Sequence, residues 1–247
     1  MASIVVSADT LVAGSDRPLV EATLGDVRIL VLNRPEVRNA LSLEVRKEFA
    51  RMTQAAEADP AIKAVIITGA HGFFSAGVDL KERAAGPPQP MFRPHPAESA
   101  RAVTKPFIAA IDGPCVTGAL ELALSCSFLI ASDRARFADT HAKVGLFPGW
   151  GQSALLASAV GVRRARQLSL TGAFIDVQTA LVWGLVNEIT TPEKLLPRAL
   201  EICAQMSAAN ERSVRMQLDV YARHDGVPFE VALATEYAAA DVWRAGA

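Results

Sequence analysis

The sequence predicts an α/β fold in which a strand-rich core is followed by a helical C-terminal segment. Two patterns support this: short continuous apolar runs alternate with amphipathic helical stretches, and the chain after residue 152 is almost entirely helical in pattern. Of its 247 residues, 51% are hydrophobic, which is enough for a large buried core. We expect a core over residues 1–190 and a C-terminal helical oligomerisation segment over residues 191–247.

The first part of the chain contains two predicted strands and one long helix. Residues 1–18 are weakly patterned, and residues 27–32 and 64–68 are continuous apolar runs typical of buried strands. Residues 43–58 carry apolar side chains at helical spacing after Ser42, which suits an N-cap. Residues 84–96 contain several prolines and therefore predict a loop, which we interpret as a lid over a site.

The second part continues the alternation and then becomes helical. Residues 107–111 and 128–131 predict strands on either side of a short apolar helix over residues 118–126. The later predicted helices cover residues 152–168, 176–183, 193–209, 211–223 and 228–244. Strands and helices in this order suggest right-handed ββα or βαβ units.

Composition narrows the function classes. With 25 basic and 26 acidic residues, the net charge of −1 gives no electrostatic reason to expect nucleic acid or a membrane surface as a partner. The three cysteines form no CxxC pair, and the four histidines show no metal-ligand spacing, so we expect no metal site. A reduced, cytoplasmic protein is the resulting expectation.

The first segment that could carry chemistry covers residues 73–82. Here a strand runs through Ala76-Gly77 into a predicted helix that starts near Val78. The first N–H groups of a helix have no internal acceptor, and the helix dipole favours negative charge there. Taken alone, the segment is also compatible with an ordinary strand-to-helix connection.

The second segment covers residues 111–124 and has the same strand–glycine–helix form. Glu121 is the lone acid in an apolar helix, and burying an unpaired carboxylate costs several kcal/mol. A capping-box role fits poorly, because the residue three positions earlier is Gly118. Two helix starts and one buried acid together indicate an oxyanion site with an acid/base group beside it.

Both segments resemble the signature segments of the crotonase (enoyl-CoA hydratase/isomerase) superfamily. Supporting similarities are found in residues 33–35, 39–41, 137–149, 171–172, 180 and 184–186. The resemblance covers roughly residues 20–190 and implies a crotonase-like ββα spiral core. It also implies an acyl-CoA substrate of the kind used in fatty acid metabolism, with coenzyme A as part of the substrate and no separate cofactor, and a homotrimer or a dimer of trimers.

The resemblance also assigns residues. It places the two oxyanion N–H donors at Val78 and Gly118 and the first catalytic acid at Glu121. It further implies that the coenzyme A channel is lined by backbone near Arg38, Ala40, Ala76, Asp79 and Leu80.

One position departs from the family pattern. Hydratases of the family carry a second glutamate twenty residues after the first, and this chain has His141 there. An imidazole, with an ordinary pKa of about 6.5, can donate or accept a proton near neutral pH, so His141 is a candidate partner of Glu121. The alternative is a structural surface histidine on a short helix that begins at Asp139 or Thr140.

Retention of Glu121 favours hydratase or dehydratase chemistry, because the family's double-bond isomerases generally keep the second acid and lose the first. Trp150 falls where the family often has a small residue, and we expect it to narrow the acyl pocket. We therefore predict an enoyl-CoA hydratase-like lyase with a Glu121/His141 pair. An enoyl-CoA isomerase and a non-catalytic acyl-CoA-binding protein remain as alternatives.

Overall fold

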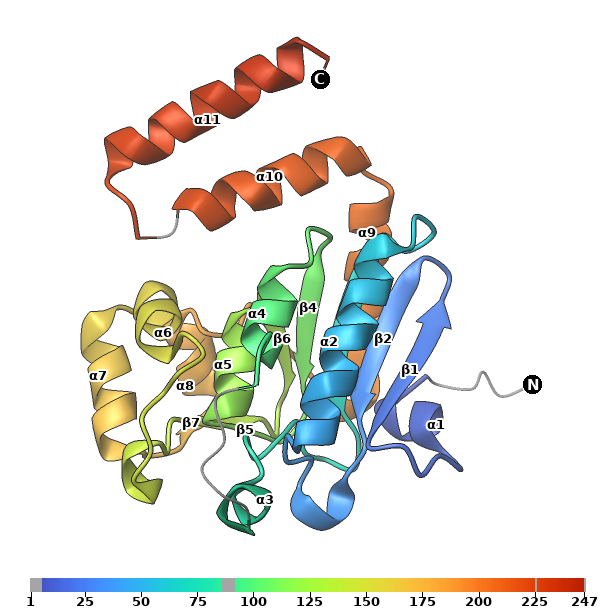
Figure 1. The fold of residues 1–247 in the computed structure, drawn as a ribbon, viewed down its shortest axis with the longest axis vertical. Coiled ribbons are helices and arrows are strands. Elements are labelled where there is room, and N and C mark those ends of the chain that lie inside the picture. The colour runs from blue at the N-terminus through green and yellow to red at the C-terminus, as the bar shows by residue number, and fades with distance from the viewer. Residues whose placement is uncertain (1–5, 86–91, 225, 247) are drawn as a thin grey trace.

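The protein is described here by a computed structural model, which covers residues 6–85, 92–224 and 226–246. Its centre is a six-stranded sheet in the order β1-β2-β3-β4-β6-β9 (Figure 1). β1 and β2 pair in antiparallel fashion, and the other neighbours pair in parallel. The strands are β1 (Leu19–Leu24), β2 (Val27–Leu32), β3 (Ala64–Gly69), β4 (Phe107–Ile111), β6 (Phe128–Ser132) and β9 (Glu188–Thr190).

The central strands are apolar on both faces because helices cover both sides of the sheet. Every residue of β3 and β4 is buried, which explains why their sequences are continuous apolar runs rather than alternating ones. The predicted strands at 27–32, 64–68, 107–111 and 128–131 are confirmed. The edge strands β1 and β9 were not predicted, because most of their residues are only partly buried and show no clear pattern.

The predicted helix over residues 43–58 is confirmed as α2 (Leu43–Ala58), and it covers one face of the sheet. Its N-cap is Ser42, whose hydroxyl accepts a hydrogen bond from the Val45 N–H at 3.2 Å. The helix buries one side, with Phe49 and Met52 among the most enclosed side chains of the molecule. Each such burial stabilises the fold by about 1.5–3 kcal/mol.

Other helices complete the two layers. α4 (Pro96–Arg101) and α5 (Gly118–Leu124) belong to the same hydrophobic cluster as α2, whereas α1 (Ala8–Val12) and α9 (Pro192–Ser207) belong to the cluster on the opposite face (Figure 1). α9 follows the predicted boundary at residue 190, and its buried residues belong to the hydrophobic cluster on that face of the sheet.

A second, three-stranded sheet lies beside the main one. It joins β5 (Pro114–Val116), β7 (Arg136–Ala138) and β8 (Ile175–Asp176) in the order β5-β7-β8. β5 leads directly into α5, and β7 leads to His141 and the short 3-10 helix η2 (Ala142–Val144). This sheet therefore brings the region of Glu121 close to that of His141.

The structure corrects three of the predicted elements. The helix expected over 152–168 is two helices, α6 (Gln152–Val160) and α7 (Val162–Thr171), separated by Gly161 with φ +81° and ψ +148°. The weakly patterned N-terminal segment contains the Ser7-capped α1. The loop predicted over residues 84–96 is too long at both ends, because α3 (Leu80–Ala85) continues to Ala85 and α4 begins at Pro96; residues 86–91 of the predicted lid lie outside the described residues.

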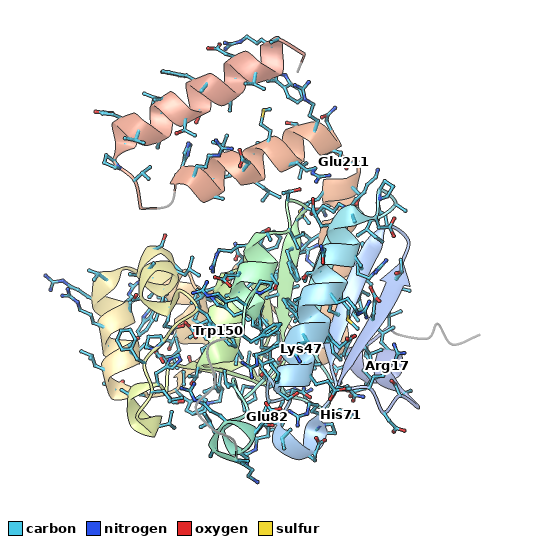
Figure 2. The ribbon with its side chains drawn as sticks, viewed as in Figure 1. Arg17, Lys47, His71, Glu82, Trp150 and Glu211 are labelled. Atoms are coloured by element: carbon cyan, nitrogen blue, oxygen red, sulfur yellow. The ribbon has the colours of Figure 1, made fainter. Side chains whose placement is uncertain are left out.

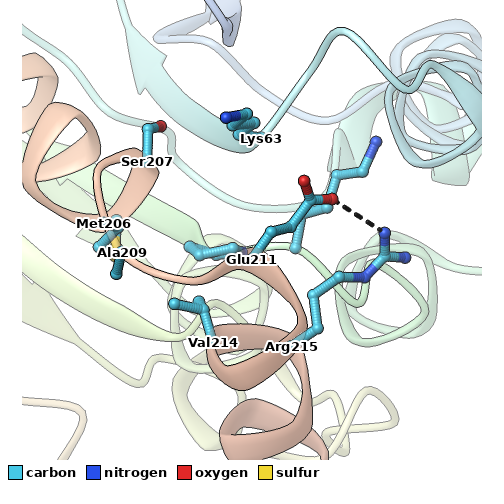
Figure 3. A pocket seen from close by; sticks show the side chains of 9 residues that line it. Lys63, Met206, Ser207, Ala209, Glu211, Val214 and Arg215 are labelled. Carbon is cyan, nitrogen blue, oxygen red and sulfur yellow. Dashed lines mark ion pairs between the residues drawn. The ribbon is translucent and has the colours of Figure 1, made fainter. Parts of the chain in front are cut away.

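The C-terminal helices α10 (Glu211–His224) and α11 (Phe229–Arg244) form a hairpin that projects away from the core (Figure 1). Neither helix contains a buried residue. A small pocket lies where α10 leaves the core, and none of its lining residues is a predicted site residue (Figure 3). The remaining helix is α8 (Val177–Trp183), and a 3-10 turn, η1 (Pro35–Val37), precedes α2.

Candidate active site

Two loops that follow β2 and β3 are held together by a short parallel backbone ladder. The Ala76 N–H donates to the Arg38 carbonyl at 3.0 Å, the Leu41 N–H donates to the Gly77 carbonyl at 2.8 Å, and the Asp79 N–H donates to the Leu41 carbonyl at 3.3 Å. The ladder places the two segments predicted to line a coenzyme A channel side by side.

A buried asparagine holds the first of these loops in shape. The Asn39 amide donates to the carbonyls of Ala70 and Phe73 at 2.9 and 2.7 Å, and its oxygen accepts from the Arg34 N–H at 2.7 Å. Asn39 has φ +54°, a conformation that asparagine tolerates better than most residues. The loop is therefore fixed by side-chain bonds to backbone.

The two predicted oxyanion donors lie next to each other. A methyl group built on Gly118 would lie 3.5 Å from the Val78 nitrogen, and one built on Gly77 would lie 3.1 Å from the Gly118 nitrogen and 2.8 Å from the Val116 carbonyl oxygen. Gly77, with φ +88°, is thus required both by its conformation and by this close approach. Gly118 is the first residue of α5, so its N–H has no acceptor within the helix.

The residue before Gly118 is strained. Thr117 has φ +58° and ψ −114°, a conformation that costs about 1–3 kcal/mol for a β-branched residue. Its backbone N–H donates to Ala138 at 2.9 Å, and its hydroxyl contacts the Thr140 hydroxyl at 2.6 Å and accepts from the Thr140 N–H at 3.1 Å. These bonds hold the start of α5 against the segment that carries His141.

Glu121 is buried, with 2% of its surface exposed. Its Oε1 accepts hydrogen bonds from the backbone N–H groups of Trp150 at 2.7 Å and Gln152 at 3.2 Å. Burial raises the pKa of Glu121 above its ordinary value, and these two hydrogen bonds and nearby His141 offset only part of the effect. Glu121 therefore holds a proton more readily than an exposed glutamate does, and Oε2 is the oxygen left for chemistry.

His141 lies beside that oxygen. Its Nε2 is 3.5 Å from Glu121 Oε2, and its Nδ1 is 2.7 Å from Asp139 Oδ1. The ring is buried, with 7% of the residue exposed, so the expected alternative of a surface histidine does not describe its position. A water molecule does not fit between two atoms this close, but one lying beside the pair can form hydrogen bonds with both Nε2 and Oε2.

Trp150 forms one wall of the site. A methyl group built on Gly118 would lie 3.2 Å from its Cζ3 atom, so the indole ring borders the predicted oxyanion donors. Trp150, which is labelled in Figure 2, stacks its ring on His95 at the start of α4, with ring centroids 5.4 Å apart. Burial, together with Arg101 and Arg93, lowers the pKa of His95 to about 4, so this histidine is neutral at physiological pH.

The predicted channel residues differ in their environments. Arg38, Ala76 and Leu80 are exposed, whereas Ala40 is buried under the ladder. Asp79 is 8% exposed, and its carboxylate accepts a hydrogen bond from Arg34 at 3.0 Å. Arg34 also donates to the Ala40 carbonyl at 2.7 Å, so the Asp79 side chain links the two loops.

Several residues of this region were not found from the sequence. Asp139 stands two positions before His141, and this short spacing is the one feature of the sequence that could have indicated their contact. Ser169 and His95 come from helices that are distant in sequence, so no local pattern reveals them. They become visible only when the helices are packed together.

Two adjacent backbone N–H groups, a buried glutamate and a histidine meet at one place in this fold, and such an arrangement can hold an anionic oxygen beside an acid/base group. Comparison with known proteins then assigns the family: the model of the enoyl-CoA hydratase/isomerase family matches residues 24–236. This chain belongs to the enoyl-CoA hydratase/isomerase family, and its fold is the crotonase fold.

Individual relatives agree with this assignment. A probable enoyl-CoA hydratase of Mycobacterium leprae, echA8, is 36% identical over 193 residues, which are 77% of this chain and 75% of that protein. The crystal structure of an enoyl-CoA hydratase from Mycobacterium tuberculosis H37Rv is 44% identical with a TM-score of 0.77, covering 92% of this chain and 95% of the other. A Geobacillus kaustophilus enoyl-CoA hydratase subunit is 27% identical with a TM-score of 0.87, covering 93% and 90%.

Proposed function

We propose that this protein adds water reversibly across the double bond of a 2-enoyl-coenzyme A thioester. The observation that carries the proposal is the buried Glu121–His141 pair, whose Oε2 and Nε2 atoms lie 3.5 Å apart beside the start of α5. The similarity to proteins named enoyl-CoA hydratase supports the same reaction.

In the proposed reaction, the thioester oxygen accepts hydrogen bonds from the N–H groups of Val78 and Gly118. As water attacks the β-carbon, negative charge moves to this oxygen, and the two donors stabilise the enolate more strongly than the substrate. Because the donors are backbone groups on fixed loops, they need no reorganisation during the step.

The proton balance uses both side chains. His141 Nε2 accepts a proton from the attacking water, whose oxygen becomes the hydroxyl at the β-carbon. Glu121 Oε2 donates a proton to the α-carbon, a role that its raised pKa favours. Transfer of the proton from His141 to Glu121 across 3.5 Å then restores the starting state.

The test is hydration of short and medium 2-enoyl-CoA thioesters by the wild type, Glu121→Ala and His141→Ala. We expect turnover by the wild type and losses of about 100-fold or more for each variant. Tight thioester binding without turnover at any chain length would instead identify a non-catalytic acyl-CoA-binding protein. Full activity of Glu121→Ala would contradict the assigned mechanism.

We further propose that the protein works as a homotrimer or a dimer of trimers through the α10–α11 hairpin. Neither helix of the hairpin has a buried residue, yet the two helices and their described flanking residues present large apolar side chains, including Tyr221, Phe229, Tyr237 and Trp243. An exposed apolar surface of this kind is stabilised by contact with another subunit. Light scattering tests this: a mass near one 26.2 kDa chain would contradict it.

Entry of an acyl-coenzyme A from the surrounding solution fits a protein that acts away from a membrane, and we propose a cytoplasmic location. Among the residues that the structure describes, none of the helices has both the length and the apolar character needed to cross a bilayer.

A further inference from the structure

A continuous line of side chains extends from the buried Glu121 to Ser169 on α7. Glu121 Oε2 lies 3.5 Å from His141 Nε2, His141 Nδ1 lies 2.7 Å from Asp139 Oδ1, and the Ser169 hydroxyl donates to Asp139 Oδ2 at 2.6 Å. The four residues come from α5, from the segment between β7 and η2, and from α7. Neither Asp139 nor Ser169 has a part in the reaction as proposed above.

Asp139 is an enclosed carboxylate that is kept ionised by its neighbours. It is 1% exposed, and besides the two side-chain bonds it accepts a hydrogen bond from the His141 N–H at 3.2 Å. Burial alone would raise the pKa of Asp139, but the hydrogen bonds from His141 and Ser169 outweigh burial and hold that pKa below its ordinary value. A buried carboxylate is costly without such partners.

An ionised carboxylate can only accept hydrogen bonds, which determines the state of the neighbouring imidazole. Nδ1 must carry the hydrogen that Asp139 accepts, so in the neutral ring Nε2 has a free lone pair. That lone pair is on the side of the ring that faces Glu121. Within the part of the chain that the structure describes, the titratable groups paired with the ring are Glu121 from α5 and Asp139 from its own segment, while Ser169 of α7 acts through Asp139.

We propose that Asp139 is a positioning residue for the hydration: it holds His141 in the Nδ1–H form with Nε2 directed at Glu121, and Ser169 fixes Asp139 in turn. The proposal rests on the proposed function. During turnover Asp139 also stabilises the imidazolium that forms when Nε2 accepts a proton from water, while Asp139 itself keeps its charge. Ser169 has no contact with the reacting atoms in this scheme.

The first test is the proton position on the His141 ring, which does not depend on turnover. Nitrogen-15 NMR of the histidine side chains distinguishes Nδ1–H from Nε2–H, and the His141→Gln variant assigns the signal. At a pH where the ring is neutral, we expect the Nδ1–H form in the wild type and loss of that preference in Asp139→Ala. An Nε2–H ring in the wild type would overturn the proposal.

The second test is kinetic. Asp139→Asn keeps the shape of the side chain and removes its charge, so kcat should fall by about 100-fold with little change in KM. Unchanged kcat in Asp139→Asn, alongside a His141→Gln variant that is inactive, would refute the role of Asp139 and leave the proposed function standing.

Two matched serine variants separate positioning from general stability. Ser169→Ala removes the 2.6 Å bond to Asp139, whereas Ser132→Ala removes a similar 2.7 Å bond to Asp112 away from the site. Ser169→Ala should lower kcat by about 3–10-fold, and Ser132→Ala should not lower it. Equal effects of the two variants would contradict the proposal. If the wild type hydrates no enoyl-CoA, the proposed function fails, and the ring spectrum still decides whether Asp139 positions His141.

Discussion

Replacing Gly118 by alanine places a single methyl group at the predicted oxyanion donors. The new Cβ would lie 3.2 Å from Trp150 Cζ3, 3.2 Å from Val78 Cγ2 and 3.5 Å from the Val78 nitrogen. The first two contacts are tighter than ordinary van der Waals contact, so neighbouring atoms must move by a few tenths of an ångström. The methyl group also occupies space close to where the thioester oxygen would meet the two N–H groups.

The expected loss follows from the value of one oxyanion donor. Removing such a donor lowers kcat by about 10²–10³-fold, equivalent to about 2.7–4 kcal/mol of transition-state stabilisation. The free energy of unfolding should change much less, because alanine is favoured over glycine in a helix by up to about 1 kcal/mol, which offsets part of the steric cost of the new methyl group.

The assay is steady-state hydration of a four-carbon 2-enoyl-CoA by the wild type and Gly118→Ala, with thermal unfolding of both. We expect a large fall in kcat with melting temperatures within a few degrees. The double variant Val78→Ala/Gly118→Ala removes one of the two tight contacts and should not recover activity. Wild-type activity in Gly118→Ala would refute the position of the oxyanion donors.

Three further changes test other parts of the site. Glu121→Gln should lower kcat by at least about 100-fold. It should also raise the melting temperature at neutral pH, because folding raises the pKa of Glu121, so the ionised carboxylate destabilises the folded state at pH values above the ordinary glutamate pKa of 4.5. In acid, where the carboxyl group is protonated in both states, the melting temperatures of variant and wild type should converge. Because the pKa of His95 is about 4 in the folded state, unfolded chains bind a proton there between pH 6.5 and 4 that folded chains do not. The free energy of unfolding of the wild type should therefore fall by up to about 3 kcal/mol from pH 6.5 to 4. In urea titrations, the free energy of unfolding of His95→Asn should depend less steeply on pH. Trp150→Phe should raise kcat/KM for an eight-carbon relative to a four-carbon enoyl-CoA by several-fold, and an unchanged ratio would show that Trp150 does not limit the acyl pocket.

Much of the fold could be predicted because buried strands and helices show a recognisable pattern of apolar residues in the local sequence. β2 and α2 have the predicted bounds, since a doubly covered strand is apolar throughout and a covered helix is apolar along one side. β1 was not predicted, because most of its residues are partly buried and give no clear apolar pattern. Its position at the sheet edge depends on pairing with β2. The break between α6 and α7 depends on the conformation of one residue, Gly161.

The site was predictable only where its residues lie in short segments. Glu121 could be recognised because a lone acid in an apolar helix is costly to bury without a function or a partner. The glycines before it indicate that two backbone segments lie close together there. The line from His141 through Asp139 to Ser169 joins residues up to 30 positions apart, and it forms because β7 and α7 are packed together. The domain boundary, the assembly and the individual site roles stay predictions.

Addition of water to an enoyl-CoA by this protein can be measured by the mass of the product formed in ¹⁸O-labelled water. We expect a 3-hydroxyacyl-CoA with ¹⁸O on the β-carbon, formed by the wild type and strongly reduced with Glu121→Gln. A product with the mass of the substrate would indicate isomerisation, and no product at any chain length would indicate binding alone. Either result would show that hydration is not the reaction of this protein.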